Sequence, residues 1–166
     1  MSSRDARHPA WIGIGANLGD PARQIAAAVD GLKHLPHTRL AALSATYRTA
    51  PVGGPEQPDY FNAVARIDTA LDPDALLREL LALERDQGRT RSIPNAPRTL
   101  DLDLLLYSDR IISLGHLTVP HPRMHLRRFV LEPLLEIDPD CIIPGIGAAS
   151  DWHAQTLDQN VEKIAP

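Results

Sequence analysis

Cysteine is nearly absent from this chain. Cys141 is the only one among 166 residues, so the chain can form neither an internal disulfide bond nor a metal site built from several cysteines. A lone cysteine in a globular protein most often behaves as a small buried hydrophobic residue. We therefore expect Cys141 to lie in the core, and redox chemistry is not indicated.

Long apolar runs and an excess of positive charge are also missing. No run approaches the ~20 apolar residues that cross a membrane, and the N-terminal sequence MSSRDARHPA lacks the apolar centre of a signal peptide. The formal net charge is −4, which argues against a general nucleic-acid binder because such proteins need a basic surface. These absences predict a cytoplasmic protein with no membrane or nucleic-acid partner.

The order of expected elements predicts an α+β fold. A strand at 10–16 precedes a helix at 21–35, for which Asp20 is the N-cap and Pro21 the first residue. The later elements are strands within 38–48 and 61–69, a helix at 73–86 after the cap Asp72, a strand at 99–107, short strands near 110–113 and ending at Val119, and a helix at 127–136 that Pro133 limits or bends.

The order β-α-β-β-α-β through residue 107 is that of a ferredoxin-like core, in which an antiparallel-rich sheet is flanked by helices, followed here by a C-terminal extension. The length of 166 residues suits one domain. We expect a single domain over 1–166, with residues 1–9 as a flexible tail.

The segment APRTLDLDLLLY at 96–107 carries the clearest chemical signal. Side chains alternate along a strand, so Asp101 and Asp103 lie on one face with Cα atoms about 6.6 Å apart. Two such carboxylates suit a hard cation such as Mg²⁺. A solvated acidic strand face is the plainer alternative, but the apolar run that follows indicates a strand covered on both faces.

Arginines cluster at 85–98 and 123–128, which indicates a small anionic ligand in an acidic protein. Arg98 precedes the acidic strand, and its planar guanidinium suits two phosphate oxygens. Solvated arginines that complement the dipole of a helix are the alternative for Arg85 and Arg91. The pattern favours phosphate chemistry.

The glycine-rich stretch at 13–17 does not complete a dinucleotide-binding motif, and no Walker lysine motif occurs. We interpret Gly13 and Gly15 as residues that let strand and helix pack closely, with Asn17 open to a ligand. Aromatic residues make up only 4% of the chain, which draws attention to Tyr60 and Phe129. Each is either core filling or a stacking platform.

Six stretches in the same order resemble the 6-hydroxymethyl-7,8-dihydropterin pyrophosphokinase family. They are IGIGANLGD at 12–20, YRTAPVG at 47–53, QPDYFNA at 57–63, ERDQGR at 84–89, APRTLDLDLLLY at 96–107 and TVPHPRM at 118–124. The resemblance implies an ATP-dependent diphosphokinase of folate biosynthesis that transfers pyrophosphate from MgATP to the pterin alcohol and releases AMP. We expect the protein to be a monomer.

By this resemblance, Asp101 and Asp103 hold two Mg²⁺ ions and act in catalysis with Arg89 and Arg98. The residues implied at ATP are Glu84, Arg89, Arg91, Arg98, Thr118, His121 and Arg127. Those implied at the pterin are Thr49, Val52, Gly53, Tyr60, Asn62 and Phe129.

Two departures from the family pattern stand out. Many members carry Arg-Trp-Gly-Pro-Arg before the acidic strand, in a loop that is one residue longer than here, whereas this chain has IPNAPR at 93–98. In addition, Pro122 follows His121, where some relatives have a tyrosine. Two alternative functions remain open at this point. One is a noncatalytic ferredoxin-like module that binds a nucleotide or pterin, and the other is an RNA-binding ferredoxin-like domain.

Overall fold

The computed structural model describes residues 7–17, 20–49, 59–88 and 100–164. Six strands form the main sheet of this part of the chain, and all of their pairings are antiparallel. Across the sheet they are β10 (Glu162–Lys163), β3 (Tyr47–Thr49), β4 (Tyr60–Thr69), β1 (His8–Ala16) and β5 (Asp101–Tyr107), and β2 (Thr38–Leu43) also pairs with β4.

Two helical connections give the sheet its topology. Helix α1 (Pro21–Lys33) leads from β1 to the β2–β3 segment, and α2 (Pro73–Gly88) leads from β4 to β5. In each case one strand lies between the two that are connected, β4 in the first and β1 in the second. This is the split β-α-β arrangement of a ferredoxin-like fold, so the predicted fold class is confirmed.

Both helix starts follow the predicted local chemistry. The Asp20 carboxylate accepts a hydrogen bond from the backbone N–H of Arg23 at 3.2 Å, and Pro21 opens α1. The Asp72 carboxylate accepts from the N–H of Ala75 at 2.8 Å. These bonds satisfy N–H groups that have no partner inside the first turn of a helix.

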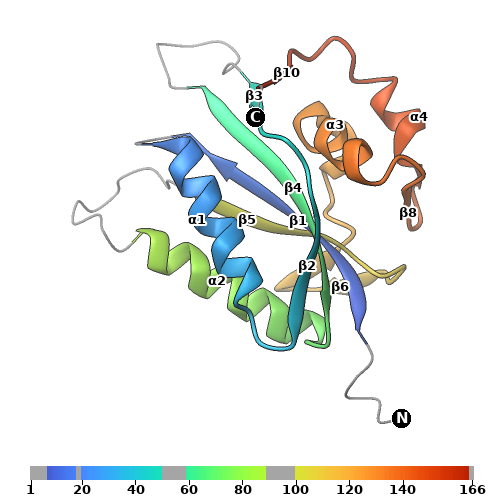
Figure 1. Cartoon of the computed structure of the whole chain (residues 1–166). Helices are drawn as coiled ribbons and strands as arrows, with labels where there is room; N and C mark the ends of the chain where they lie inside the picture. Colours follow the sequence, from blue (N-terminus) through green and yellow to red (C-terminus); the bar gives the residue numbers. More distant parts are fainter. Residues whose placement is uncertain (1–6, 18–19, 50–58, 89–99, 165–166) are drawn as a thin grey trace.

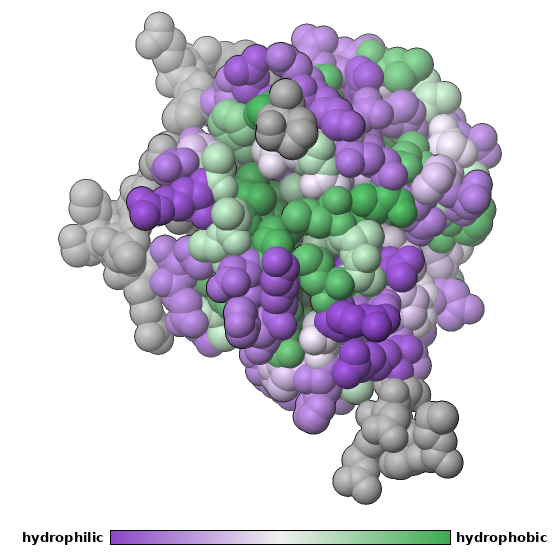
Figure 2. Space-filling view, viewed as in Figure 1, coloured by the Kyte–Doolittle hydropathy of each residue, from purple (hydrophilic) through white to green (hydrophobic). Residues whose placement is uncertain are grey.

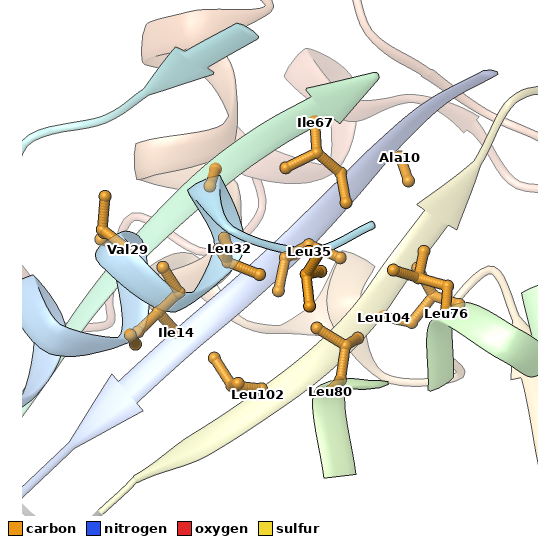
Figure 3. Close-up of a cluster of buried hydrophobic side chains, with 14 of the residues drawn as sticks. Ala10, Ile14, Val29, Leu32, Leu35, Ile67, Leu76, Leu80, Leu102 and Leu104 are labelled. Carbon is orange, nitrogen blue, oxygen red and sulfur yellow. The ribbon is translucent and has the colours of Figure 1, made fainter. Parts of the chain in front are cut away.

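One face of the sheet packs against α1 and α2 (Figure 1). Alternate residues of the strands meet the apolar faces of these two helices in a buried cluster (Figure 3). Its labelled members are Ala10, Ile14, Val29, Leu32, Leu35, Ile67, Leu76, Leu80, Leu102 and Leu104. This cluster is the larger of the two hydrophobic cores.

The opposite face packs against α3 (Arg128–Ile137), and α4 (Ala149–His153) packs against α3 in turn (Figure 1). An irregularity in the pairing of β1 with β5 leaves Leu105 as an extra residue between Leu104 and Leu106. Leu104 therefore lies in the first core, while Leu105 and Leu106 both lie in the second. The leucine run is covered on both faces, as predicted.

Shorter elements complete the chain. They are the hairpin of β6 (Ile112–Leu114) and β7 (Leu117–Val119), the 3₁₀ helix η2 (Met124–Leu126), and the hairpin of β8 (Ile142–Ile143) and β9 (Gly147–Ala148). Cys141 is buried in the second core, as predicted, and its burial raises the pKa of the thiol to about 12. Hydrophobic residues form a band over the strands between α1 and α3, surrounded by hydrophilic residues (Figure 2).

The structure differs from the sequence predictions in several places. The strand character at 38–48 belongs to two strands, because Ser44 turns inward and its hydroxyl accepts a hydrogen bond from the N–H of Val64 at 2.9 Å. Helix α3 spans Arg128–Ile137, one residue later at each end than predicted, and Pro133 lies buried inside it without ending it. Strand β1 begins at His8, so the end of the expected tail at 1–9 lies in the sheet.

None of the helices in the described residues is long and apolar enough to cross a membrane.

The packing of α2 gives a test of the first core. We expect Leu80→Ala to lower the free energy of unfolding by about 2–5 kcal/mol, because Leu80 is fully buried and its loss leaves a cavity. The next residue is the matched control, since Leu81 is 41% exposed and Leu81→Ala costs about 1 kcal/mol or less. Urea denaturation of both variants measures the difference. Equal losses would contradict this assignment of the helix face.

Candidate active site

A cavity of about 240 Å³ opens on the sheet face that carries α3. We call it the central cavity. It is lined by Gly13, Ile14, Gly15, Ala16, Asn17, Thr49, Tyr60, Asn62, Ala63, Val64, Asp101, Asp103, Leu105, Arg127, Phe129 and Val130. Strands β1, β3, β4 and β5 and the start of α3 therefore all contribute to it.

Two glycines of β1 form the floor of the central cavity. Gly15 pairs with Asn62 on one side and with Asp101 on the other, and Gly13 pairs with Asp103. A Cβ atom at Gly15 would lie 3.1 Å from Oδ1 of Asn62. The prediction that these glycines serve strand–helix packing is wrong, because they lie on the sheet face opposite α1 and leave room between polar side chains.

The predicted alternation along β5 is confirmed. Asp101 and Asp103 are exposed, whereas Leu100, Leu102 and Leu104 are buried. Both aspartates line the central cavity. The described residues hold no group of three or more His, Cys, Asp or Glu side chains that could enclose a metal ion. The carboxylate pair therefore suits a Mg²⁺ ion that takes its other ligands from water and a bound phosphate.

Polar and aromatic side chains surround the rest of the central cavity. Tyr60 is 42% exposed, and Asn62 follows it on the same face of β4. The hydroxyl of Thr49 is buried and has no hydrogen-bond partner among the described residues. Phe129 lies under Arg127, whose guanidinium carbon is 5.6 Å from the ring centroid. A flat polar ligand would find stacking surfaces and hydrogen-bonding groups here.

A second cavity of about 270 Å³ adjoins the first, and Asp103 lines both. We call it the side cavity. It is lined by Leu77, Leu81, Glu84, Leu102, Asp103, Leu104, His116, Leu117, Thr118, His121 and Pro122. The Glu84 carboxylate accepts a hydrogen bond from the N–H of Leu102 at 2.7 Å, which ties α2 to β5 beside this cavity.

His121 is held at the side cavity by its own backbone and ring. Its N–H donates to the carbonyl of Leu105 at 2.9 Å, and its Nδ1 accepts from the N–H of Arg123 at 3.2 Å. Burial lowers the pKa of His121, Asp103 opposes this effect, and Arg127 and Arg123 add to it. Burial thus favours the neutral ring, in which Nε2 carries the proton because Nδ1 accepts.

The structure brings the described members of the predicted site together in two groups. Thr49, Tyr60, Asn62, Asp101, Asp103, Arg127 and Phe129 line the central cavity, while Glu84, Asp103, Thr118 and His121 line the side cavity. Five predicted site residues lie outside the described residues, namely Val52, Gly53, Arg89, Arg91 and Arg98.

Sequence reasoning missed several lining residues. Gly13 and Gly15 share one face of β1, a signal that simple strand alternation contains, whereas Asn17, which follows the strand, lines the central cavity as the sequence suggested. Leu77 and Leu81 of α2 line the side cavity, and helical spacing alone does not show that a helix also borders a cavity.

Two adjoining cavities that meet at an aspartate give this ferredoxin-like domain room for two ligands side by side, as a two-substrate transferase requires. The comparisons with known proteins identify its family. The family model for 7,8-dihydro-6-hydroxymethylpterin-pyrophosphokinase matches residues 11–139. The chain belongs to this family.

Curated relatives match most of the chain. The 2-amino-4-hydroxy-6-hydroxymethyldihydropteridine pyrophosphokinase of Haemophilus influenzae is 43% identical over 157 residues, which are 95% of this chain and 98% of the relative. The protein of the same name from Pseudomonas aeruginosa is 46% identical over 134 residues, 81% of this chain and 83% of the relative.

Solved structures show the same fold. An HPPK-DHPS structure in complex with substrates has a TM-score of 0.71 at 12% identity, covering 92% of this chain and 44% of that one. Wild-type Plasmodium falciparum HPPK-DHPS with pteroate has a TM-score of 0.70 at 11% identity, covering 92% and 45%. The chain thus spans less than half the length of these two solved chains.

Proposed function

We propose that this protein transfers pyrophosphate from MgATP to 6-hydroxymethyl-7,8-dihydropterin in folate biosynthesis. The hydroxymethyl oxygen attacks the β-phosphorus, the bond from that phosphorus to the α,β-bridging oxygen breaks, and AMP leaves with that oxygen. The hydroxyl proton is released in the same reaction. The observation that carries the proposal is the meeting of two ligand-sized cavities at Asp103.

The pterin binds in the central cavity. Tyr60 and Phe129 supply aromatic surfaces for a flat bicyclic ring. The Asn62 amide can donate and accept at the edge of a heterocycle, and the buried Thr49 hydroxyl needs a partner that a heteroatom of the ligand can provide. Val52 and Gly53 complete this edge in our proposal, although they lie outside the described residues.

ATP binds in the side cavity. Leucines from α2, β5 and β7 offer an apolar surface for the base, and Glu84 and Thr118 lie among them. The triphosphate extends toward Asp103, where the Nε2–H of neutral His121 can donate to a phosphate oxygen. Arg127 contributes positive charge from the central cavity, and we assign Arg89, Arg91 and Arg98 to the phosphates by family resemblance.

Asp101 and Asp103 hold two Mg²⁺ ions in this proposal. Their oxygens are the hard donors that Mg²⁺ prefers, and both lie on the cavity side of β5. When bound, the ions neutralise charge on the triphosphate. The protein's own contribution is placement, since the floor at Gly13 and Gly15 sets the pterin beside the aspartates. We further propose that the protein acts as a monomer in the cytoplasm.

Product analysis tests the reaction. Incubation with MgATP and the pterin alcohol is expected to give AMP and pterin diphosphate in equal amounts, measured by chromatography. Formation of ADP would refute pyrophosphate transfer. Binding of both ligands without any AMP would instead favour a noncatalytic nucleotide- or pterin-binding module.

The aspartates provide a second test. We expect Asp101→Asn and Asp103→Asn each to lower kcat by about 100-fold or more, because each removes a charged metal ligand while keeping its shape. Asp109→Asn is the matched control, since Asp109 is an exposed aspartate just after the same strand. Steady-state assays at saturating Mg²⁺ measure kcat for the three variants and the parent. Near-normal turnover in either site variant would remove that residue from the metal assignment.

Gly13 and Gly15 give a test that separates pterin binding from ATP binding. A methyl group at Gly15 would press on Oδ1 of Asn62 at 3.1 Å, so Gly15→Ala should weaken pterin binding about tenfold by displacing the amide. Gly13→Ala should cost less, because its Cβ would meet Leu105 at an ordinary 3.4 Å. Calorimetric titration with pterin and with an ATP analogue separates the effects. If Gly15→Ala lowered the affinity for both ligands to a similar degree, the substitution would have distorted β1 as a whole.

A further inference from the structure

Arg127 forms the link between η2 and α3 and has an extended backbone, with φ −120° and ψ 112°. Its side chain makes no capping hydrogen bond to the helix that it precedes. Instead, Arg127 and the nearby Phe129 both line the central cavity. The direction of both side chains therefore depends on how the backbone is fixed at this link.

The N–H of Arg127 donates to the carbonyl of Met124, and its carbonyl accepts from Val130 and Leu131. A single side chain from the C-terminal segment adds a bond on each side of Arg127. Oε1 of Gln159 accepts from the N–H of Arg128 at 2.9 Å, and Nε2 of Gln159 donates to the carbonyl of Leu126 at 2.9 Å. These two groups belong to the peptide units immediately before and after Arg127. The amide thus bonds to an extended residue in the way that a neighbouring strand would.

Arg128 holds this segment in place in return. Its Nη1 donates to the carbonyl of Gln159 at 2.7 Å and to that of Leu157 at 3.2 Å. Its Nε donates to Glu132 at 2.9 Å, and the other oxygen of Glu132 lies 2.9 Å from Nε2 of His153 in α4. The charged side chains of this group are only 21–26% exposed. Such partly buried pairs are less screened by solvent than surface ion pairs.

We propose that Gln159 is a positioning residue, which acts through the backbone of Arg127 to aim Arg127 and Phe129 into the central cavity. The proposal rests on the proposed function, in which Arg127 faces the phosphates and Phe129 faces the pterin. The segment that supplies Gln159 passes α3 between α4 and β10, far from the cavity in the sequence (Figure 1). Loss of the amide removes two of the backbone bonds at this link without removing any group that touches a substrate.

Kinetics of three variants test the effect on the reaction. Gln159→Ala should lower kcat/KM for both substrates about tenfold, since two backbone bonds are lost. Gln159→Glu keeps the acceptor for the Arg128 N–H but not the donor to Leu126, so its loss should be intermediate. Gln155→Ala is the matched control, an exposed glutamine in the same segment, and should stay within about twofold of the parent.

A double-mutant cycle distinguishes positioning from simple stability. In an Arg127→Ala background, Gln159→Ala should cost no more than about threefold, because one of the two side chains that it positions is gone. An unchanged tenfold loss in that background would overturn the proposal, as would full activity of Gln159→Ala in the parent.

Hydrogen exchange gives a readout that does not depend on catalysis. In the ligand-free protein, NMR should show the Arg128 amide exchanging at least about tenfold faster in Gln159→Ala than in the parent, and near the parent rate in Gln159→Glu. Equal protection in Gln159→Ala and the parent would also overturn the inference. We call the two hydrogen bonds of Gln159 to the backbone beside Arg127 the clamp. If the parent makes no AMP, the proposed function fails, while this measurement still shows whether the clamp forms.

Discussion

The pairing of β1 between β4 and β5 is the constraint on which the rest of this structure depends. Its register places Gly15 between Asn62 and Asp101, and Gly13 opposite Asp103. A shift of one residue would turn the glycines toward α1 and place Ile12 and Ile14 in the cavity. The same pairing thus builds the first core from the isoleucines and opens a polar cavity on the other face.

The extra residue Leu105 changes which face of the sheet the side chains of β5 point to. Before it, the aspartates face the cavity and the leucines face the first core. From that point on, Leu105 and Leu106 both enter the second core, where they meet Val130, Leu131 and Leu134 of α3. Among the strands, α3 packs mainly on β4, and its buried residues share the second core with Leu105 and Leu106 of β5. The two sides of the site therefore share one rigid support.

The sequence predicted those features whose causes are local. Asp20 and Pro21 start α1 by contacts within one turn, and the alternation of Asp101 and Asp103 with leucines is a property of β5 alone. The role of Gly15 depends on which strands lie beside it, and that pairing joins residues far apart in the sequence. Gln159 carried no signal either, because an isolated glutamine in a polar stretch says nothing about a contact with Leu126.

Two kinds of residue serve the site of this protein: those that line the cavities, and those of the clamp at Arg127, which hold the backbone behind them. The family model matches residues 11–139, which include every described residue of both cavities. Gln159 and His153 lie beyond that range and act on α3 through Arg128 and Glu132. A cavity residue must suit the substrates, whereas a clamp residue must only hold a backbone segment still. Different side chains can meet the second requirement, so the chemistry of the substrates constrains Gln159 less than it constrains the residues of the cavities.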